Sequence, residues 1–287
     1  MNSSRSSRPP SIWNCEHVDL AVYARRIGLH GAAWPVGADE HALRLLHRAH
    51  VSTIPFDNID LVTRVPVALD PAAVVAKLCG RPRGGCCHEH NLLFGCVLER
   101  QGFHVDRLAA RVLLGGEGPR PRTHMALRVR HGHGNWLCDV GFGVRGFLDP
   151  LDLSDGAVSE QSGGTFRVRT LREPFWAVET LLEAGWTALY HFTLEPQQPM
   201  DFIVAHHFLS THPRSMLRRA PLLQLTTADR RLHLHGVEFS EDSGGMRATL
   251  TLTASTLAHA LAEFGIRLPA DQLLDLTRRL FPRTEER

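Results

Sequence analysis

The chain has 287 residues, of which 43% are hydrophobic, and its formal net charge is +2. Its length and apolar content suffice for a substantial core in one to about three domains. The charge is too close to neutral to favour nucleic acid as a general partner. No apolar run approaches the roughly 18 residues that a membrane-spanning helix needs, so we expect no membrane partner either.

The first residues carry no recognisable targeting signal. Met1–Pro10 consists mainly of Ser, Arg and Pro, and no apolar stretch follows it, which is unlike a secretory signal peptide. We expect residues 1–17 to form a disordered tail. Six cysteines in a chain of this length, without an export signal, favour reduced thiols over a disulfide framework. The expected location is therefore the cytoplasm.

Residues 18–104 are expected to form a helical domain. Apolar residues recur there at helical spacing in four segments. The predicted helices are Leu20–Ala24, Ala42–His50, Pro71–Leu78 and a segment that begins near Cys87 and ends at Gly102. A turn at Pro55–Asn58 interrupts them and presents the aromatic ring of Phe56.

The last of these helices places a thiol directly after the glycine-rich turn Arg83–Gly85. The first turn of a helix has unpaired N–H groups and the positive end of the backbone dipole, and both favour a thiolate. Cysteines in such settings have pKa values well below the free value of about 8.5. Cys87 is therefore the candidate nucleophile, and Cys86 is expected to be a bystander. Arg83, near the acidic Glu89, is expected to brace the loop.

Residues 105–204 have a strand-like pattern, and the remainder is mixed. Apolar and polar residues alternate at Thr123–Arg130, Trp136–Val140 and Phe166–Thr170. In residues 205–287, apolar–polar stretches at Leu232–Glu238 and Arg247–Thr253 precede a predicted helix at Thr256–Phe264. Helices first and strands afterwards favour segregated α+β layers over alternating βαβ units.

One predicted hairpin brings a histidine and an aspartate together. A two-residue loop at 131–132 pairs His124 directly with Asp139, whereas a loop at 132–133 makes them diagonal neighbours on one face, about 7–8 Å apart. A loop with an odd number of residues puts the two side chains on opposite faces. Either of the two-residue loops thus predicts a His–Asp pair.

These residues form a complete set for nucleophilic acyl transfer. Cys87 attacks an acyl carbon, His124 accepts its proton, and Asp139 holds the imidazole and stabilises its cationic form. Backbone N–H groups at the start of the Cys87 helix are candidates for stabilising the oxyanion. Gly141–Gly143, directly after Asp139, allows the backbone to turn closely against a ligand.

A metal site is the main alternative for the same segment. Its thiols and imidazoles are of the types that zinc prefers. The residues concerned are Cys86, Cys87, His88, His90 and Cys96. Their spacing matches no usual zinc finger, because no Cys-x2-Cys pair and no distant partner pair accompany it, so we assign no metal ligands.

Several motifs together resemble the arylamine N-acetyltransferase family. The run Arg83-Gly84-Gly85-x-Cys87-x-Glu89-x-Asn91 is similar to the signature of that family. Further similar segments follow in the family's order over most of the chain. They are Ile54–Asp60, Thr123–His124, Asp139–Gly143 and Ser210–Pro213.

The resemblance implies an α+β fold with a papain-like Cys-His-Asp triad. Residues 18–104 would form a helical bundle with the nucleophile, residues 105–204 a β-barrel with the histidine and aspartate, and residues 205–287 an α/β lid. It also implies a ping-pong reaction in which acetyl-CoA, a substrate and not a permanently bound cofactor, acylates Cys87. An arylamine, hydrazine or arylhydroxylamine then takes the acetyl group.

Binding residues and departures follow from the same resemblance. Phe56 and Phe142 would line the aromatic acceptor pocket, and Thr123 and Gly141–Gly143 would lie near the CoA arm. His90 stands where the family usually has Gln or Leu. Val144–Arg145 replaces the usual Gly-Gln after Gly143.

Two other functions remain open. Amide synthases that release and cyclise ansamycin-type polyketides use the same triad on a carrier-bound thioester, and an acyl carrier protein would then be the partner. A non-catalytic zinc-binding or scaffold protein is the second alternative.

Overall fold

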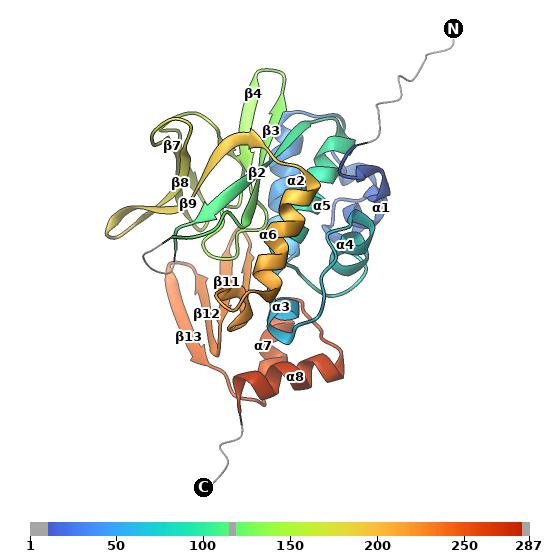
Figure 1. Cartoon of the computed structure of the whole chain (residues 1–287), viewed down its shortest axis with the longest axis vertical. Helices are drawn as coiled ribbons and strands as arrows, with labels where there is room; N and C mark the ends of the chain where they lie inside the picture. Colours follow the sequence, from blue (N-terminus) through green and yellow to red (C-terminus); the bar gives the residue numbers. More distant parts are fainter. Residues whose placement is uncertain (1–10, 115–118, 283–287) are drawn as a thin grey trace.

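A computed structural model of the chain describes residues 11–114 and 119–282. It contains a group of helices, an eight-stranded and nearly closed barrel, and a second sheet with two helices at the other end of the molecule (Figure 1). The expected α+β architecture of helical bundle, barrel and α/β lid is therefore confirmed. No helix within the described ranges is long and apolar enough to cross a bilayer.

The helical part surrounds one buried helix. Its elements are η1 Cys15–His17, α1 Leu20–Arg26, η2 Gly31–Ala33, α2 Glu40–Thr53, α3 Ile59–Thr63, α4 Pro71–Leu78 and α5 Cys87–Gln101. Aspartate side chains accept N–H groups at the starts of α1, α2 and α4, as helix N-termini require. Helix α5 is buried from Cys87 to Leu98 and ends at Gly102 with a φ of 114°.

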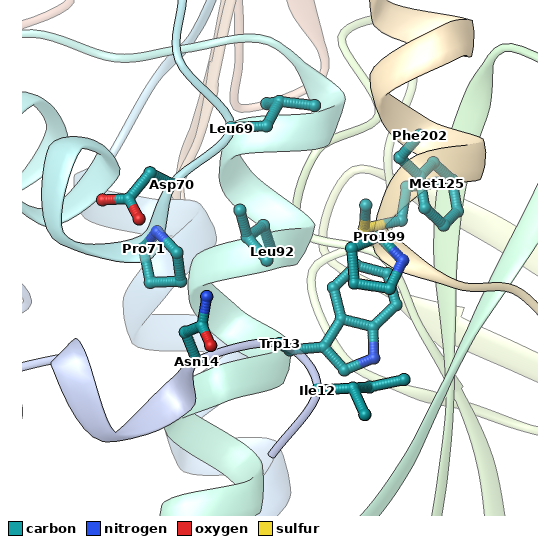
Figure 2. Close-up of a pocket in the computed structure, with 10 residues that line it drawn as sticks. All are labelled: Ile12, Trp13, Asn14, Leu69, Asp70, Pro71, Leu92, Met125, Pro199 and Phe202. Atoms are coloured by element: carbon teal, nitrogen blue, oxygen red, sulfur yellow. The ribbon is translucent and has the colours of Figure 1, made fainter. Parts of the chain in front are cut away.

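The prediction that residues 1–17 form a disordered tail is partly wrong. Residues 1–10 lie outside the described ranges, but residues 11–17 are folded, with Trp13 and Cys15 buried. The indole of Trp13 packs against Phe202 at a centroid distance of 6.0 Å, and the Arg107 guanidinium lies 4.6 Å from its ring centroid. Figure 2 shows Trp13 and Phe202 beside a small hollow between the N-terminal segment, α4, α5 and the start of α6 Pro199–Thr211. Burial of this large aromatic side chain helps to order the segment.

The barrel is built from antiparallel neighbours in the order β5-β4-β3-β2-β9-β8-β7-β6. Its strands are β2 His104–Val112, β3 His124–His131, β4 Gly134–Cys138, β5 Leu151–Asp152, β6 Val158–Gln161, β7 Gly164–Thr170, β8 Trp176–Leu182 and β9 Gly185–Pro196. Aromatic side chains such as Phe166, Tyr190 and Phe192 fill its interior. It is thus a packed core without an open channel.

The β3–β4 hairpin adopts the second of the two predicted registers. Arg130 pairs with Asn135, and His131 pairs with Gly134, so the loop is Gly132–His133. Gly132 has a φ of 56°. A positive φ at the first loop position is typical of a type II′ turn, whose twist matches that of the strands.

The predicted barrel boundary at residue 204 is wrong. Strand β9 ends at Pro196, and α6 runs from Pro199 to Thr211 across the expected boundary. Pro199 occupies the first turn, and Asp201 accepts the N–H of Gln198 to close a capping box. The helix has apolar residues on both its buried and exposed sides, which obscures its helical periodicity.

The C-terminal part forms the lid. Its elements are η3 Met216–Arg218, β10 Leu222–Thr226, β11 Arg230–His235, β12 Glu238–Ser243, β13 Met246–Thr251, α7 Leu257–Glu263 and α8 Ala270–Leu280. The segment expected as a turn at Pro55–Asn58 contains β1 Phe56–Asp57, which adds to this sheet beside β10. Ile59 and Val62 extend the same contact into the lid core. The lid is therefore anchored on the loop that leads into α3.

Candidate active site

The turn before α5 can be made only by glycine. A Cβ on Gly84 would lie 1.8 Å from the carbonyl oxygen of Pro55, well inside van der Waals contact. The Gly84 N–H donates to Oδ2 of Asp57 at 3.0 Å, and the Asp57 N–H donates to the carbonyl of Gly85 at 2.8 Å. These contacts fix where the backbone enters helix α5.

Buried charges hold the same turn. The Arg83 guanidinium donates to Oδ1 of Asp60 at 2.8 Å and contacts Oδ1 of Asp57 at 3.4 Å. Lys77 pairs with Asp60 at 2.7 Å and with Glu89 at 2.8 Å, and Glu89 accepts the N–H of Cys86 at 2.9 Å. Arg83 thus braces the loop through the two aspartates, whereas the acidic Glu89 pairs with the lysine.

The predicted His–Asp pair is present. Nε2 of His124 lies 2.6 Å from Oδ2 of Asp139, because the diagonal register places both side chains on one face. Burial alone would raise the pKa of Asp139. The nearby His124 and hydrogen bonds from His124, Asn91 and the Gly141 N–H outweigh burial and lower it. The carboxylate is therefore charged and oriented.

Two residues that we did not assign from the sequence hold Asp139 in place. The Asn91 amide donates to Oδ1 of Asp139 at 2.9 Å and to the carbonyl of Met125 at 2.7 Å. Nε2 of His47 accepts the Asp139 N–H at 3.2 Å. Its Nδ1 lies 2.9 Å from the carbonyl of Leu148, so Nδ1 carries the proton. Of these two residues, only Asn91 could have been identified from the sequence, because it belongs to the signature run.

Cys87 lies against the backbone on both sides of His124. Its Sγ is 3.9 Å from the carbonyl oxygen of Thr123, and the N–H of Met125 also interacts with the thiol. Within the described residues, no hydrogen bond joins Cys87 Sγ to the His124 ring. Cys87, His124 and Asp139 are 4%, 3% and 1% exposed, so a thioester reaches the sulfur only after neighbouring side chains move.

Burial and the neighbouring thiol act against the lowered pKa expected at Cys87. A hydrogen bond to Cys86, burial and the charge of Cys86 raise the pKa of the Cys87 thiol well above its usual value. The same hydrogen bond lowers the pKa of Cys86 against the effect of burial. The first cause is the hydrogen bond that the two thiols share, because it acts in opposite directions on the pKa values of its two partners.

The expected binding residues lie around this pair. The Phe142 ring contacts the His124 ring edge-on at 5.2 Å, and Phe56 packs in one apolar cluster with Cys87. A Cβ on Gly143 would lie 2.4 Å from the Phe56 ring, and a Cβ on Gly141 would lie 2.8 Å from Cα of Cys87. Both aromatic rings are buried.

The two departures from the family pattern have different surroundings. His90 lies fully buried between Nε2 of His50, at 2.8 Å, and the carbonyl of Pro55, at 3.1 Å. Arg145 is exposed, with a φ of 56°, and its N–H donates to the Gln224 side chain at 2.8 Å. His90 therefore supports the loop at Pro55, and Arg145 adds charge where Gly141–Gly143 reaches the lid.

The soft-ligand cluster considered for zinc does not converge. Across residues 11–114 and 119–282, no group of three or more His, Cys, Asp or Glu side chains is arranged to hold a metal ion. Cys96 lies instead near Cys15, with Nη2 of Arg107 at 3.8 Å from its sulfur. All six cysteines are free.

Known proteins are similar to this chain in both sequence and fold. A family model described as N-acetyltransferase matches residues 39–273. The arylamine N-acetyltransferase of Mycolicibacterium smegmatis is 35% identical over 259 residues, which is 88% of this chain and 93% of the relative. The structure of the arylamine N-acetyltransferase from Mycobacterium abscessus aligns with a TM-score of 0.87 and 37% identity, covering 96% of this chain and 99% of the other. That of Mycobacterium marinum arylamine N-acetyltransferase in complex with CoA gives 0.84 and 33%, with coverage of 91% and 98%.

Proposed function

Because the chain belongs to the arylamine N-acetyltransferase family, we propose that Cys87, His124 and Asp139 carry an acetyl group from acetyl-CoA to an arylamine. The chain is an acyltransferase. The observation that carries the assignment of residues is the His124–Asp139 pair, at 2.6 Å, beside the backbone that contacts Cys87. A hydrazine has a nucleophilic nitrogen like that of an arylamine, and an arylhydroxylamine also has a nucleophilic oxygen. Either compound serves as an alternative acceptor.

The reaction has two halves. In the first, the Cys87 sulfur attacks the acetyl carbon while His124 accepts its proton, and His124 returns that proton to the CoA sulfur as the bond between that sulfur and the acetyl carbon breaks. In the second, the amine attacks the resulting thioester while Nδ1 of His124 takes its proton, because Nε2 is engaged with Asp139. Backbone N–H groups in the first turn of α5 have no partner within the helix and stabilise the oxyanion in both halves.

Aromatic side chains favour a flat acceptor. Phe142 contacts His124, and Phe56 packs with Cys87, so an aryl group between the two rings would bring its amine to the thioester. We assign Thr123 and Gly141–Gly143 to the CoA arm because both segments adjoin Cys87. No cofactor is needed beyond acetyl-CoA as a substrate. The free state of all six cysteines fits a reducing cytoplasm.

The two other functions are not favoured by the comparisons. The similar proteins are arylamine N-acetyltransferases, and none of those described above is an amide synthase with a carrier partner. A scaffold or zinc-binding role has no ligand cluster to support it within residues 11–114 and 119–282.

Replacement of the nucleophile tests the proposal. We expect Cys87→Ser to reduce CoA release from acetyl-CoA and an aromatic hydrazine by about 10³-fold or more, because a serine hydroxyl is a far weaker nucleophile here. Far-ultraviolet circular dichroism should remain unchanged. Cys79→Ser, on the half-buried cysteine after α4, is the control and should retain wild-type turnover. Substantial turnover by Cys87→Ser would refute the assignment.

A further inference from the structure

The last helix of the lid contacts the turn that leads into α5. Helix α8 packs beside α3 in the lower part of Figure 1. Its Gln272 accepts from Nη1 of Arg83 through Oε1 at 3.0 Å, although the two residues are 189 positions apart in the chain. Just before the helix, the Arg267 N–H donates to the carbonyl of Pro82 at 2.9 Å. The acetyl transfer described above gives this segment no role.

The amide of Gln272 has a different kind of partner on each side. Its Nε2 donates to Oδ1 of Asp60 at 2.8 Å and to Oγ1 of Thr63 at 3.0 Å. A guanidinium can only donate and a carboxylate can only accept, so the side chain between Arg83 and Asp60 must provide both an acceptor and a donor. A glutamate would lack the donor, and a lysine would lack the acceptor. The contacts therefore fit an amide.

Three side chains form a closed ring of hydrogen bonds. Arg83 donates from Nη1 to Gln272 and from Nη2 to Oδ1 of Asp60, at 2.8 Å, and Gln272 donates to the same Oδ1. Arg83 and Asp60 are 7% and 6% exposed, so a partner that is lost here is not readily replaced by water. Nε of Arg83 already has no hydrogen-bond partner among the described residues. The position of the guanidinium thus depends on Gln272.

A shift of Arg83 would reach the nucleophile through a short and constrained backbone. Only three residues separate Arg83 from Cys87. The first of them, Gly84, is held by Asp57 at 3.0 Å and leaves no room for a Cβ against Pro55. Nucleophilic attack needs a near-attack geometry, and a misplacement of about 1 Å can cost about 10²-fold in rate.

We propose that Gln272 is a positioning residue for the acetyl transfer. It holds the Arg83 guanidinium against Asp60 and so fixes where the chain enters α5 at Cys87. The inference rests on the proposed role of Cys87. Gln272 acts through Arg83 and forms no contact with the reacting atoms. Helix α8 of the lid thus belongs to the structure that places the nucleophile.

Single-turnover acylation by acetyl-CoA tests this role. Gln272→Met keeps the length of the side chain and its helix propensity but removes both the donor and the acceptor. We expect the maximal acylation rate to fall about five- to tenfold, while the acetyl-CoA concentration that gives half of that rate is unchanged. Rates are expressed per Cys87 that can be acetylated, counted by mass spectrometry, so that a misfolded fraction does not affect them.

Thr63→Val is the matched comparison. It is nearly isosteric, and it removes the hydrogen bonds of the Thr63 hydroxyl to Gln272 and to the Ile59 carbonyl but leaves Gln272 on Arg83. We expect it to lower the free energy of unfolding and to keep the wild-type acylation rate per site. Leu274→Ala, at a position of α8 that is 49% exposed, should leave the acylation rate unchanged.

A wild-type acylation rate in Gln272→Met, or an equal slowing in Thr63→Val, would overturn the proposal. Gln272→Glu provides a second variant if Gln272→Met does not fold. It keeps an acceptor for Arg83 but repels Asp60, so it should also slow acylation, and a wild-type rate there would contradict the role as well.

The two proposals fail in different ways. Turnover by Cys87→Ser would refute the nucleophile assignment and, with it, the reason for placing that thiol. A wild-type acylation rate in Gln272→Met beside an inactive Cys87→Ser would instead remove α8 from the site and leave the triad intact.

Discussion

A single amide determines how Asp139 faces His124. Asn91 donates to Asp139 and Met125 through its amide nitrogen, while its oxygen accepts the Val140 N–H at 3.1 Å. It thereby ties the nucleophile helix to both strands of the hairpin. The residue is fully buried, so its removal would take one hydrogen-bond partner from each of these buried groups.

We expect Asn91→Ala to impair both activity and stability. The turnover number should fall about 10- to 100-fold because the carboxylate is no longer held, and unfolding should cost about 1–3 kcal/mol less because buried polar groups lose partners. Steady-state kinetics and urea unfolding measure the two effects. Asn14→Ala, in the N-terminal segment, is the control for activity. Wild-type turnover in Asn91→Ala would show that Asp139 needs no support from α5.

At the scale of the element, the turn before α5 is constrained by backbone contact. Gly84 and Pro55 are in direct contact, and the surrounding charges of Arg83, Lys77 and their carboxylates are buried. Removal of one member of a buried ion pair is costly because it leaves the other charge unpaired. The network therefore specifies this conformation more than it adds to the free energy of unfolding. The position of both Cys86 and Cys87 depends on it.

Gly84→Ala should therefore be strongly destabilising. The new methyl group would lie 1.8 Å from the Pro55 oxygen, and neither backbone can move without breaking the Asp57 hydrogen bonds. We expect a loss of about 3 kcal/mol or more in urea unfolding, together with most of the activity. Gly156→Ala is the matched control, since its φ of 77° is unfavourable for alanine but its surroundings are open, and about 1 kcal/mol is expected there. Equal losses in the two variants would contradict the steric argument.

Helices and strands could be predicted from the sequence where residues at their own termini act as start or stop signals. Pro71–Leu78 is a helix as predicted, because Asp70 caps it and Pro71 occupies its first turn. The predicted end of α5 at Gly102 is likewise confirmed, and the Gly132 turn selects one of two registers that both retain the His–Asp pair. Helix α6 was not predicted, because its apolar residues do not recur at helical spacing. Only its N-terminal signals, Pro199 and the capping box, indicate a helix.

At the scale of the whole molecule, four histidines of α2 and α5 are fully buried. They are His47, His50, His88 and His90. Burial lowers their pKa values, to about 4 for His47 and His90 and to about 3 for His88. Between pH 6.5 and about 4 the unfolded chain thus binds protons that the folded chain does not, so stability falls as pH falls. Each histidine contributes a slope of about 1.4 kcal/mol per pH unit.

Glu89 acts in the opposite direction. Burial outweighs the nearby Lys77 and raises the pKa of Glu89 to about 8, so the contact between the two is a hydrogen bond below that pH. Between pH 8 and 4.5 the folded chain thus binds a proton that the unfolded chain does not. Its contribution to the free energy of unfolding is therefore lost as pH rises. This pH dependence is opposite to that of the histidines and cancels the effect of about one of the four. These five groups together leave a net slope of about three protons below pH 6.5, and His233, whose pKa burial lowers to about 4, adds about one more.

Urea unfolding at a series of pH values tests this count. We expect the free energy of unfolding to fall steeply from pH 6.5 towards pH 4.5, and His90→Gln to reduce the slope by about one proton. His41→Gln, at an exposed position on α2, should leave the slope as in the wild type. If His90→Gln and His41→Gln have the same slope as the wild type, burial of His90 is not what makes the protein sensitive to acid.

The sequence by itself determined the family, the α+β architecture and the catalytic candidates Cys87, His124 and Asp139. These depend on residue types at short spacings, namely a glycine-rich helix start and a two-residue hairpin. The tertiary structure decided what depends on distant contacts. The pairing of β1 with β10, the support of Asp139 by His47 and the location of His206 beside Cys86 each join segments far apart in the chain. The pKa of a thiol depends on such neighbours and on burial, so the helix start by itself did not determine the pKa of Cys87.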